Sequence, residues 1–196
     1  MMSRDRVAVE QRKTKETEIV ASVNLDGEGR SDIKTGIGFF DHMLDQIARH
    51  GNIDLELSVK GDLQIDEHHS IEDTGIALGK AFAKALGDKK GIKRFSNALV
   101  PLDETLVRAV VDISGRPYLY TDLSFSREMV GDFPSEMVVE FMRAFAFNAG
   151  ITLHLEILHG ENCHHQIEAV FKSLARALKE AVKIESDKIP STKGVL

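Results

Sequence analysis

The chain contains two copies of the pattern His-His-x-x-Glu, at residues 68–72 and 164–168, and these residue types bind metal ions. Positions i and i+4 lie on one face of a helix, so the first His and the Glu of each copy form a pair of ligands. The second His lies about 100° further round the helix axis and must point at a different partner. The pattern therefore predicts two similar metal sites. The ligand pairs are His68 with Glu72 and His164 with Glu168, and the second histidines are His69 and His165.

The two clusters belong to an internal duplication of the chain, which sets the expected architecture. Each half is predicted to contain strands, a helix, a strand and a closing amphipathic helix, with both helices on one face of a sheet, an α+β arrangement. We place the halves at residues 1–90 and 91–196 and expect them to form one compact catalytic domain. The matching segments are 16–27 with 104–115, 43–48 with 141–146, 53–57 with 151–155, and 68–85 with 164–181.

The repeat adds ligand candidates that a motif search misses. His42 on the first helix of the first half aligns with Glu140 in the second half, provided that one residue is inserted before Gly150. We expect two mixed nitrogen and oxygen shells that interchange under the repeat, which suit Mn²⁺, Fe²⁺ or Zn²⁺ better than Mg²⁺ or Ca²⁺. One shell holds His68, Glu72, His165 and Glu140, and its image holds His164, Glu168, His69 and His42.

Other candidate ligands have simpler interpretations. His154 competes with Glu140 but aligns with Leu55 and so lacks a symmetry partner. Cys163, the only cysteine, is interpreted as a small, partly buried thiol beside the second cluster. His50 and His159 flank glycine turns and are interpreted as solvated polar residues.

Several basic and hydroxyl side chains are candidates for gripping a phosphate, because Arg offers a planar fork, Lys a point charge and Ser a donor. Lys172 is the strongest candidate, since its i, i+4 spacing from Glu168 places it beside the metal ligands. The others are Arg94, Arg116, Ser191 and Lys193.

The composition limits the partners. The formal net charge of −6 argues against a broad nucleic-acid surface but permits a local basic pocket. No apolar stretch approaches the ~20 residues that span a bilayer, and the N-terminus lacks the apolar segment of a secretory signal. We therefore expect a cytoplasmic protein with a small-molecule substrate, without nucleic-acid or membrane partners.

Four motifs in order along nearly the whole chain resemble imidazoleglycerol-phosphate dehydratase, an enzyme family of histidine biosynthesis, in its monofunctional form. The motifs are Gly38-Phe39-Phe40-Asp41-His42-Met43-Leu44, Asp66-x-His68-His69-x-x-Glu72-Asp73, Ser114-Gly115-Arg116-Pro117, and His164-His165-x-x-Glu168-Ala169-x-Phe171-Lys172.

The resemblance implies a duplicated α+β fold of the ribosomal protein S5 domain 2-like type. It also implies two Mn²⁺ ions per active site and an assembly of 24 subunits in which neighbouring chains complete each site. Many relatives carry His at the position of Glu140, whereas the internal symmetry supports Glu140 as the ligand. The resemblance places Glu18 near the reacting carbons, Gln46 near the diol, and the phosphate on Arg94, Arg116, Lys172, Ser191 and Lys193.

The implied reaction removes water from D-erythro-imidazole-glycerol phosphate and gives imidazole-acetol phosphate. Metals on both imidazole nitrogens would favour the imidazolate, so that a diazafulvene-like intermediate forms as hydroxide leaves. A base is also required, and Glu18, His69 and Glu168 are the candidates for proton transfer. Two other classes remain open, a dinuclear metallohydrolase and a non-enzymatic metal-binding module. The deduced shells lack the bridging carboxylate of the first, and the second leaves the basic tail without a purpose.

Overall fold

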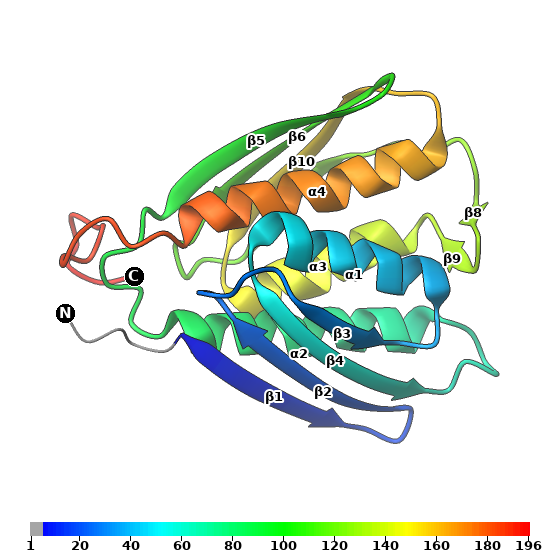
Figure 1. The fold of residues 1–196 in the computed structure, drawn as a ribbon, viewed down its shortest axis with the longest axis horizontal. Helices are drawn as coiled ribbons and strands as arrows, with labels where there is room; N and C mark the ends of the chain where they lie inside the picture. The colour runs from blue at the N-terminus through cyan, green and yellow to red at the C-terminus, as the bar shows by residue number, and fades with distance from the viewer. Residues whose placement is uncertain (1–5) are drawn as a thin grey trace.

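The first half of the chain folds into a four-stranded sheet with two helices, in a computed structural model that describes residues 6–196 (Figure 1). The strand order is β1-β2-β4-β3. β3 and β4 are parallel and are joined through α1, whereas the other neighbours are antiparallel. The elements are β1 (Val7–Lys13), β2 (Thr17–Asn24), β3 (Ser31–Lys34), α1 (Gly38–Gly51), β4 (Asp54–Gly61) and α2 (His68–Leu86).

The second half repeats this order and adds one hairpin. Its sheet has the strand order β5-β6-β10-β7, and β7 and β10 are parallel across α3. The hairpin, β8 with β9, lies between β7 and α3 and has no counterpart in the first half. The elements are β5 (Phe95–Leu102), β6 (Thr105–Asp112), β7 (Tyr118–Asp122), β8 (Met129–Val130), β9 (Phe133–Pro134), α3 (Met137–Ala149), β10 (Thr152–His159) and α4 (Cys163–Ala181).

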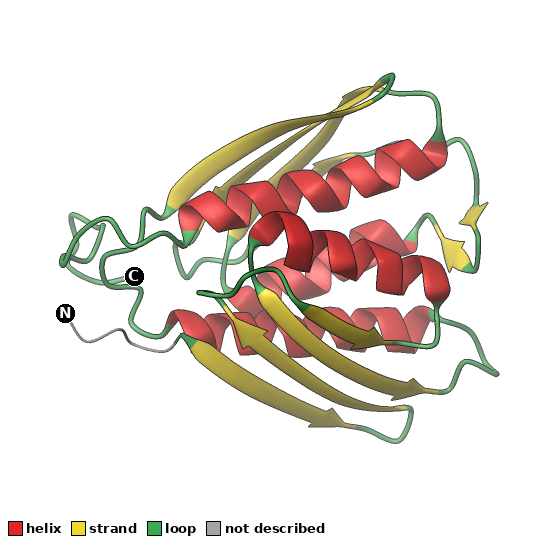
Figure 2. Ribbon diagram, in the orientation of Figure 1, coloured by secondary structure: helices red, strands yellow, loops and turns green. Residues whose placement is uncertain are grey.

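The helices lie between the two sheets and bury one face of each (Figure 2). Alternation along β2 buries Ile19, Ala21 and Val23 against the helices and leaves the other face of the sheet exposed. α1 packs against α4 and α2 against α3, so every helix contacts a helix of the other half. This confirms the α+β fold with two similar halves, and the boundary at residues 90 and 91 stays a prediction.

Helix ends correct the predicted alignment of the halves. Asn52 caps the C-terminus of α1 and Gly150 that of α3, both in the left-handed conformation with φ of 52° and 66°. The next amide closes each cap in the same way, Ile53 N to Ala48 O at 3.1 Å and Ile151 N to Ala146 O at 3.0 Å. Asn52, and not Gly51, is therefore the equivalent of Gly150. The predicted one-residue insertion is wrong, and His42 aligns with Glu140 without a gap.

None of the helices within residues 6–196 combines the length and apolarity needed to cross a membrane. The first five residues, which belong to the N-terminus where we expect no secretory signal, lie outside the described residues.

Two glycines of α2 allow the halves to approach closely. A Cβ built on Gly75 would lie 2.8 Å from the Cβ of Ala144, and one on Gly79 would lie 2.7 Å from the carbonyl oxygen of Phe145. Both neighbours belong to α3, and a carbonyl oxygen cannot move away without disturbing its helix. The contact between α2 and α3 therefore requires glycine at these positions.

Replacing Gly79 with alanine should lower the free energy of unfolding by about 1–3 kcal/mol, because overpacking outweighs the better helix propensity of alanine. Chemical denaturation of Gly79→Ala and of the matched control Lys80→Ala measures the effect. If Gly79→Ala is as stable as the parent, the close contact between the halves is not as described.

Candidate active site

Three side chains of the types that bind metal ions meet between α1 and α4. His42 Nε2 lies 3.2 Å and His164 Nε2 lies 3.0 Å from the same oxygen, Oε2 of Glu168. These ligand atoms all lie within 4.8 Å of one another. The carboxylate side chain is 12% exposed, whereas those of His42 and His164 are 47% and 44% exposed. The cluster is therefore a shallow site with a carboxylate at its base and two accessible imidazoles.

Local sequence explains how the cluster forms. Asn162 caps α4 by accepting from the amides of His164 and His165, which fixes the first turn. The i, i+4 spacing then places His164 over Glu168. Gln46, one turn after His42 on α1, donates to the His42 carbonyl at 3.1 Å, and its amide nitrogen lies 3.4 Å from His42 Nδ1.

Glu168 is ionised in this setting. Burial alone would raise its pKa, but Lys172 and the two histidines outweigh burial and lower the pKa to about 2. Lys172 Nζ lies 2.5 Å from Oε1, so one carboxylate oxygen faces the lysine and the other faces the imidazoles. The expectation that Lys172 lies beside the second cluster agrees with this geometry.

The donor set fits a divalent transition metal. Two imidazole nitrogens and one carboxylate oxygen suit Mn²⁺, Fe²⁺ or Zn²⁺, and Oε2 of Glu168 already faces both imidazoles. The half-exposed histidines leave room for further ligands from solvent, substrate or another chain.

The equivalent cluster of the first half is more open. His68 Nε2 lies 3.7 Å from Glu72 Oε2, and both side chains are nearly half exposed. Glu140, the predicted third ligand, pairs with Arg143 at 2.5 Å, on a helix that packs against α2. The structure thus brings together the pair but does not join Glu140 to it.

The second histidine of each pair turns away from the clusters within one chain. His69 Nδ1 lies 3.1 Å from Asp62, and this hydrogen bond raises the pKa of His69. His165 Nδ1 lies 2.8 Å from Glu104, with the same effect on the pKa of His165. The predicted four-residue shells are therefore not assembled within one chain. A carboxylate on Nδ1 leaves Nε2 as the ligand atom of each ring, and that of His165 lies 3.9 Å from Asp103 Oδ2.

Asp62 and Glu104 are site residues that the sequence reasoning missed. The amide of Asn162 and the ring of His165 hold the pKa of Glu104 well below its usual range. The repeat contained a signal, because Glu104 aligns with Glu16, whose charge also contributes to the raised pKa of His69.

Three other candidate residues take no part in either cluster within one chain. His154 lies on β10, with its ring 5.3 Å from the Tyr120 ring. Glu18 is exposed on β2 and pairs with Lys13 at 3.0 Å. Cys163 is 2% exposed, and burial raises its thiol pKa.

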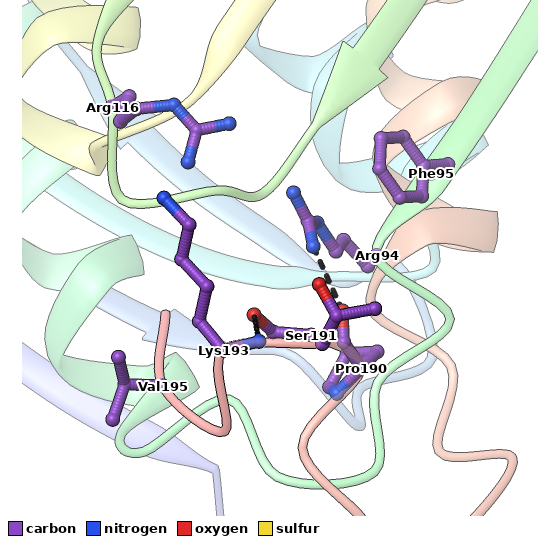
Figure 3. Close-up of a pocket in the computed structure, with 8 residues that line it drawn as sticks. Arg94, Phe95, Arg116, Pro190, Ser191, Lys193 and Val195 are labelled. Carbon is purple, nitrogen blue, oxygen red and sulfur yellow. Dashed lines mark hydrogen bonds between the residues drawn. The ribbon is translucent and has the colours of Figure 1, made fainter.

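Four of the predicted phosphate ligands line one cavity of about 610 Å³ at the other end of the molecule (Figure 3). Lys193 extends toward Arg116 in this view. The four are Arg94, Arg116, Ser191 and Lys193, and the remaining lining residues are Phe95, Pro190, Thr192 and Val195.

Arg94 organises this cavity. Its guanidinium donates to both oxygens of Asp112, at 2.7 and 3.2 Å, and to the carbonyl of Pro190, at 2.8 Å. It also lies over the Phe95 ring at 4.4 Å. Arg94 therefore ties the C-terminal tail to the second sheet. Arg116 lies 3.6 Å from Asp112 Oδ2, and its side chain is 68% exposed, so part of its guanidinium faces the open cavity.

The cavity and the His42 cluster lie at opposite ends of α4. His164 is in the first turn of α4 and the tail follows its last turn, which separates them by roughly 25 Å at 1.5 Å per residue. Lys172, predicted to bind the phosphate, and Gln46, predicted to lie near the diol, both lie beside the His42 cluster. The five residues that the resemblance places on the phosphate are therefore not assembled within one chain, because Lys172 lies with the cluster.

Comparison with known proteins identifies relatives along the whole chain. The sequence model of the family described as imidazoleglycerol-phosphate dehydratase matches residues 35–178. Enzymes of that name from Thermoanaerobacter pseudethanolicus and Clostridium botulinum are 61% and 58% identical, over 97% and 98% of this chain and all of theirs. Crystal structures from Staphylococcus aureus and Pyrococcus furiosus superpose with TM-scores of 0.83, at 41% and 38% identity. These cover 91% and 95% of this chain and 99% of each structure.

These relatives are dehydratases with the same fold, so this chain is a carbon–oxygen hydro-lyase. The chain belongs to the imidazoleglycerol-phosphate dehydratase family, which acts in histidine biosynthesis. Membership in an enzyme family sets aside the non-enzymatic metal-binding module and the metallohydrolase.

Removing the Lys193 side chain should weaken the binding of inorganic phosphate about 10- to 150-fold, the range for one charge-assisted hydrogen bond. Lys193→Ala should leave the unfolding temperature unchanged. Arg94→Ala should weaken phosphate binding and also lower the unfolding temperature, because Arg94 holds Asp112 and Pro190. Calorimetric titration and thermal unfolding separate the two effects. Lys188→Ala, in the same tail, is the control, and equal phosphate affinity in Lys188→Ala and Lys193→Ala would exclude Lys193 from the anion site.

Proposed function

We propose that the chain dehydrates D-erythro-imidazole-glycerol phosphate to imidazole-acetol phosphate, as a Mn²⁺ enzyme whose active sites are shared between chains. Family membership supports the reaction. The observation that carries the shared site is the placement of the His42 cluster and the basic cavity at opposite ends of α4. A substrate whose imidazole and phosphate are joined by three carbons cannot reach both within one chain.

Two Mn²⁺ ions per active site would withdraw electron density from both nitrogens of the substrate imidazole. The residues proposed to hold one ion are His42, His164 and Glu168, and for the other His68, Glu72 and Glu140. Glu140 would have to leave Arg143, and internal symmetry with His42 is the argument for it. His69 and His165 would complete the shells with their Nε2 atoms, from neighbouring chains. The Nε2 atom of His165 would have to leave Asp103.

The elimination breaks one C–O and one C–H bond. The hydroxyl leaves from the carbon attached to the imidazole, and the ring supplies the electron pair, through a diazafulvene-like intermediate. A base then removes hydrogen from the next carbon, which has no adjacent carbonyl to acidify it, and the electrons return to the ring. The resulting enol becomes the ketone of the product, and the net loss is one water.

The positions of the three acid–base candidates favour different roles. Both oxygens of Glu168 face other groups, Lys172 on one side and the two imidazoles on the other, which supports a ligand role. Asp62 holds Nδ1 of His69, which supports the ligand role of its Nε2 and leaves no ring nitrogen for proton transfer while the metal is bound. Glu18 is more than half exposed and pairs only with an exposed lysine in the described residues, so it is free to face substrate bound by another chain.

The phosphate end of the site is the basic cavity. Arg116, Ser191 and Lys193 are proposed to grip the phosphate, while Arg94 holds the tail that carries two of them. Gln46, beside His42, and Lys172, beside Glu168, would meet the diol and phosphate of substrate held mainly by another chain.

A homo-oligomer, which we propose to contain 24 subunits, is the natural consequence, because closed symmetry brings one end of each chain to the other end of a neighbour. We further propose a cytoplasmic location and a small phosphorylated imidazole as the ligand, without nucleic-acid or membrane partners.

Hybrid assemblies test the shared site. With Mn²⁺, the parent should dehydrate the substrate, whereas His164→Ala and the double variant Arg116→Ala with Lys193→Ala should each be nearly inactive. Co-expressing the two variants should restore up to about one quarter of the parent rate. In a random equal mixture about half of the clusters and about half of the cavities are intact, so about one quarter of the shared sites combine an intact cluster with an intact cavity.

The matched control is a mixture of His164→Ala with Glu168→Ala, which share a damaged cluster and should restore nothing. An inactive parent would refute the reaction. An active parent whose variants fail to complement would place each site within one chain.

A further inference from the structure

The connection between β7 and α3 differs from its counterpart in the first half. Residues 123–136 join these elements and contain the β8–β9 hairpin, whereas residues 35–37 join β3 to α1. We call residues 123–136 the bridging segment. It has fourteen residues against three, counted from the element bounds, and the duplication does not account for it.

The bridging segment caps a helix of the other half. Ile37 occupies the N-cap of α1 and offers no side-chain hydrogen bond. Asp132 instead accepts from the amide of Gly38 at 2.6 Å and from that of Phe39 at 3.0 Å. The first turn of α1, where free amides would otherwise remain, is therefore tied to a carboxylate of the second half.

An aromatic contact reinforces this cap. Phe133 is fully buried, and its ring lies 5.8 Å from the Phe39 ring and 5.6 Å from the Phe40 ring. Phe39 in turn meets the His164 ring edge-on, at 5.1 Å, and lies 6.4 Å from the His42 ring. A chain of ring contacts, from Phe133 through Phe39, therefore connects the hairpin to the imidazoles of His42 and His164.

The bridging segment also contacts the other helix of the cluster. The thiol of Cys163, the first residue of α4, donates to the carbonyl of Arg127 at 3.8 Å. Figure 1 shows the hairpin beside the ends at which both α1 and α4 begin. His42 and His164 each lie within the first turns of these helices.

We infer that Asp132 is a positioning residue for the His42 cluster, because it fixes the first turn of α1 against α4 and so sets His42 relative to His164 and Glu168. This inference rests on the proposed function, in which the cluster holds a Mn²⁺ ion. Among residues 6–196 no equivalent contact holds α3, the helix that carries Glu140, because its N-cap residue, Glu136, makes no side-chain cap hydrogen bond. Asp132 therefore acts on one of the two ions.

Mn²⁺ titration of the metal-free, full-length protein tests the selectivity. Asp132→Ala should weaken the binding of one of the two ions per chain about 10- to 100-fold, the range for residues that orient metal ligands, and leave the other within twofold. Excess Mn²⁺ should restore kcat. Asp132→Asn, which keeps a capping oxygen, should stay within about threefold of the parent. The control is Asp122→Ala, an exposed acid on β7.

A second measurement does not depend on metal. Amide hydrogen exchange in the metal-free protein should be faster at residues 38–42 in Asp132→Ala, and unchanged there in Asp122→Ala. Parent-like exchange, or two Mn²⁺ affinities that match the control while only the unfolding temperature falls, would overturn the inference. Equal weakening of both ions would overturn it too. A parent that binds no Mn²⁺ would instead refute the proposed function, and the exchange result would still decide whether Asp132 holds α1.

Discussion

The structure depends on a nearly buried carboxylate that both halves of the chain must satisfy. An ionised Glu168 away from water is costly unless charges and hydrogen-bond donors surround it. Lys172 and His164 come from its own helix, and His42 comes from the other half. The packing of α1 against α4 is therefore needed for the site as well as for the core, and a change that separates these helices would leave the carboxylate with fewer partners.

The internal duplication gives the two halves equivalent metal-binding residue types, but the two clusters differ in geometry. Each closing helix repeats the His and Glu pair, and each first helix delivers one residue, His42 or Glu140, toward the closing helix of the other half. The two clusters nonetheless differ in geometry. His42 has joined the second-half pair, whereas Glu140 is held by Arg143. The bridging segment, present in one half only, supplies a physical reason for this difference.

The fold could be predicted from the sequence because helix and strand periodicities were repeated, so that each half checked the other. The His164 and Glu168 pair followed from the geometry of one helix, and His42 followed from the repeat. Partners set by tertiary contacts were not predictable in this way. Nothing local in the sequence connects Asp132 to Gly38 or His69 to Asp62, because those contacts depend on how loops meet.

Lys172 and Lys193, grouped as phosphate ligands, do not meet within one chain for a related reason. Charge type suggested a common ligand, but Lys172 lies midway along α4, beside the cluster, and Lys193 lies in the tail beyond the end of α4. Only the assembled chains could bring such groups together. Spacing within one helix was therefore a sound guide to neighbours, whereas shared chemistry between distant segments was not.

Anomalous diffraction at the manganese edge, from crystals of the Mn²⁺-loaded assembly, tests the central claim most directly. The account predicts two manganese peaks per chain, one of them within bonding distance of His42, His164 and Glu168 and close to the basic cavity of a neighbouring chain. A loaded crystal with no peak at these three residues, or with the cavity of no other chain nearby, would contradict it.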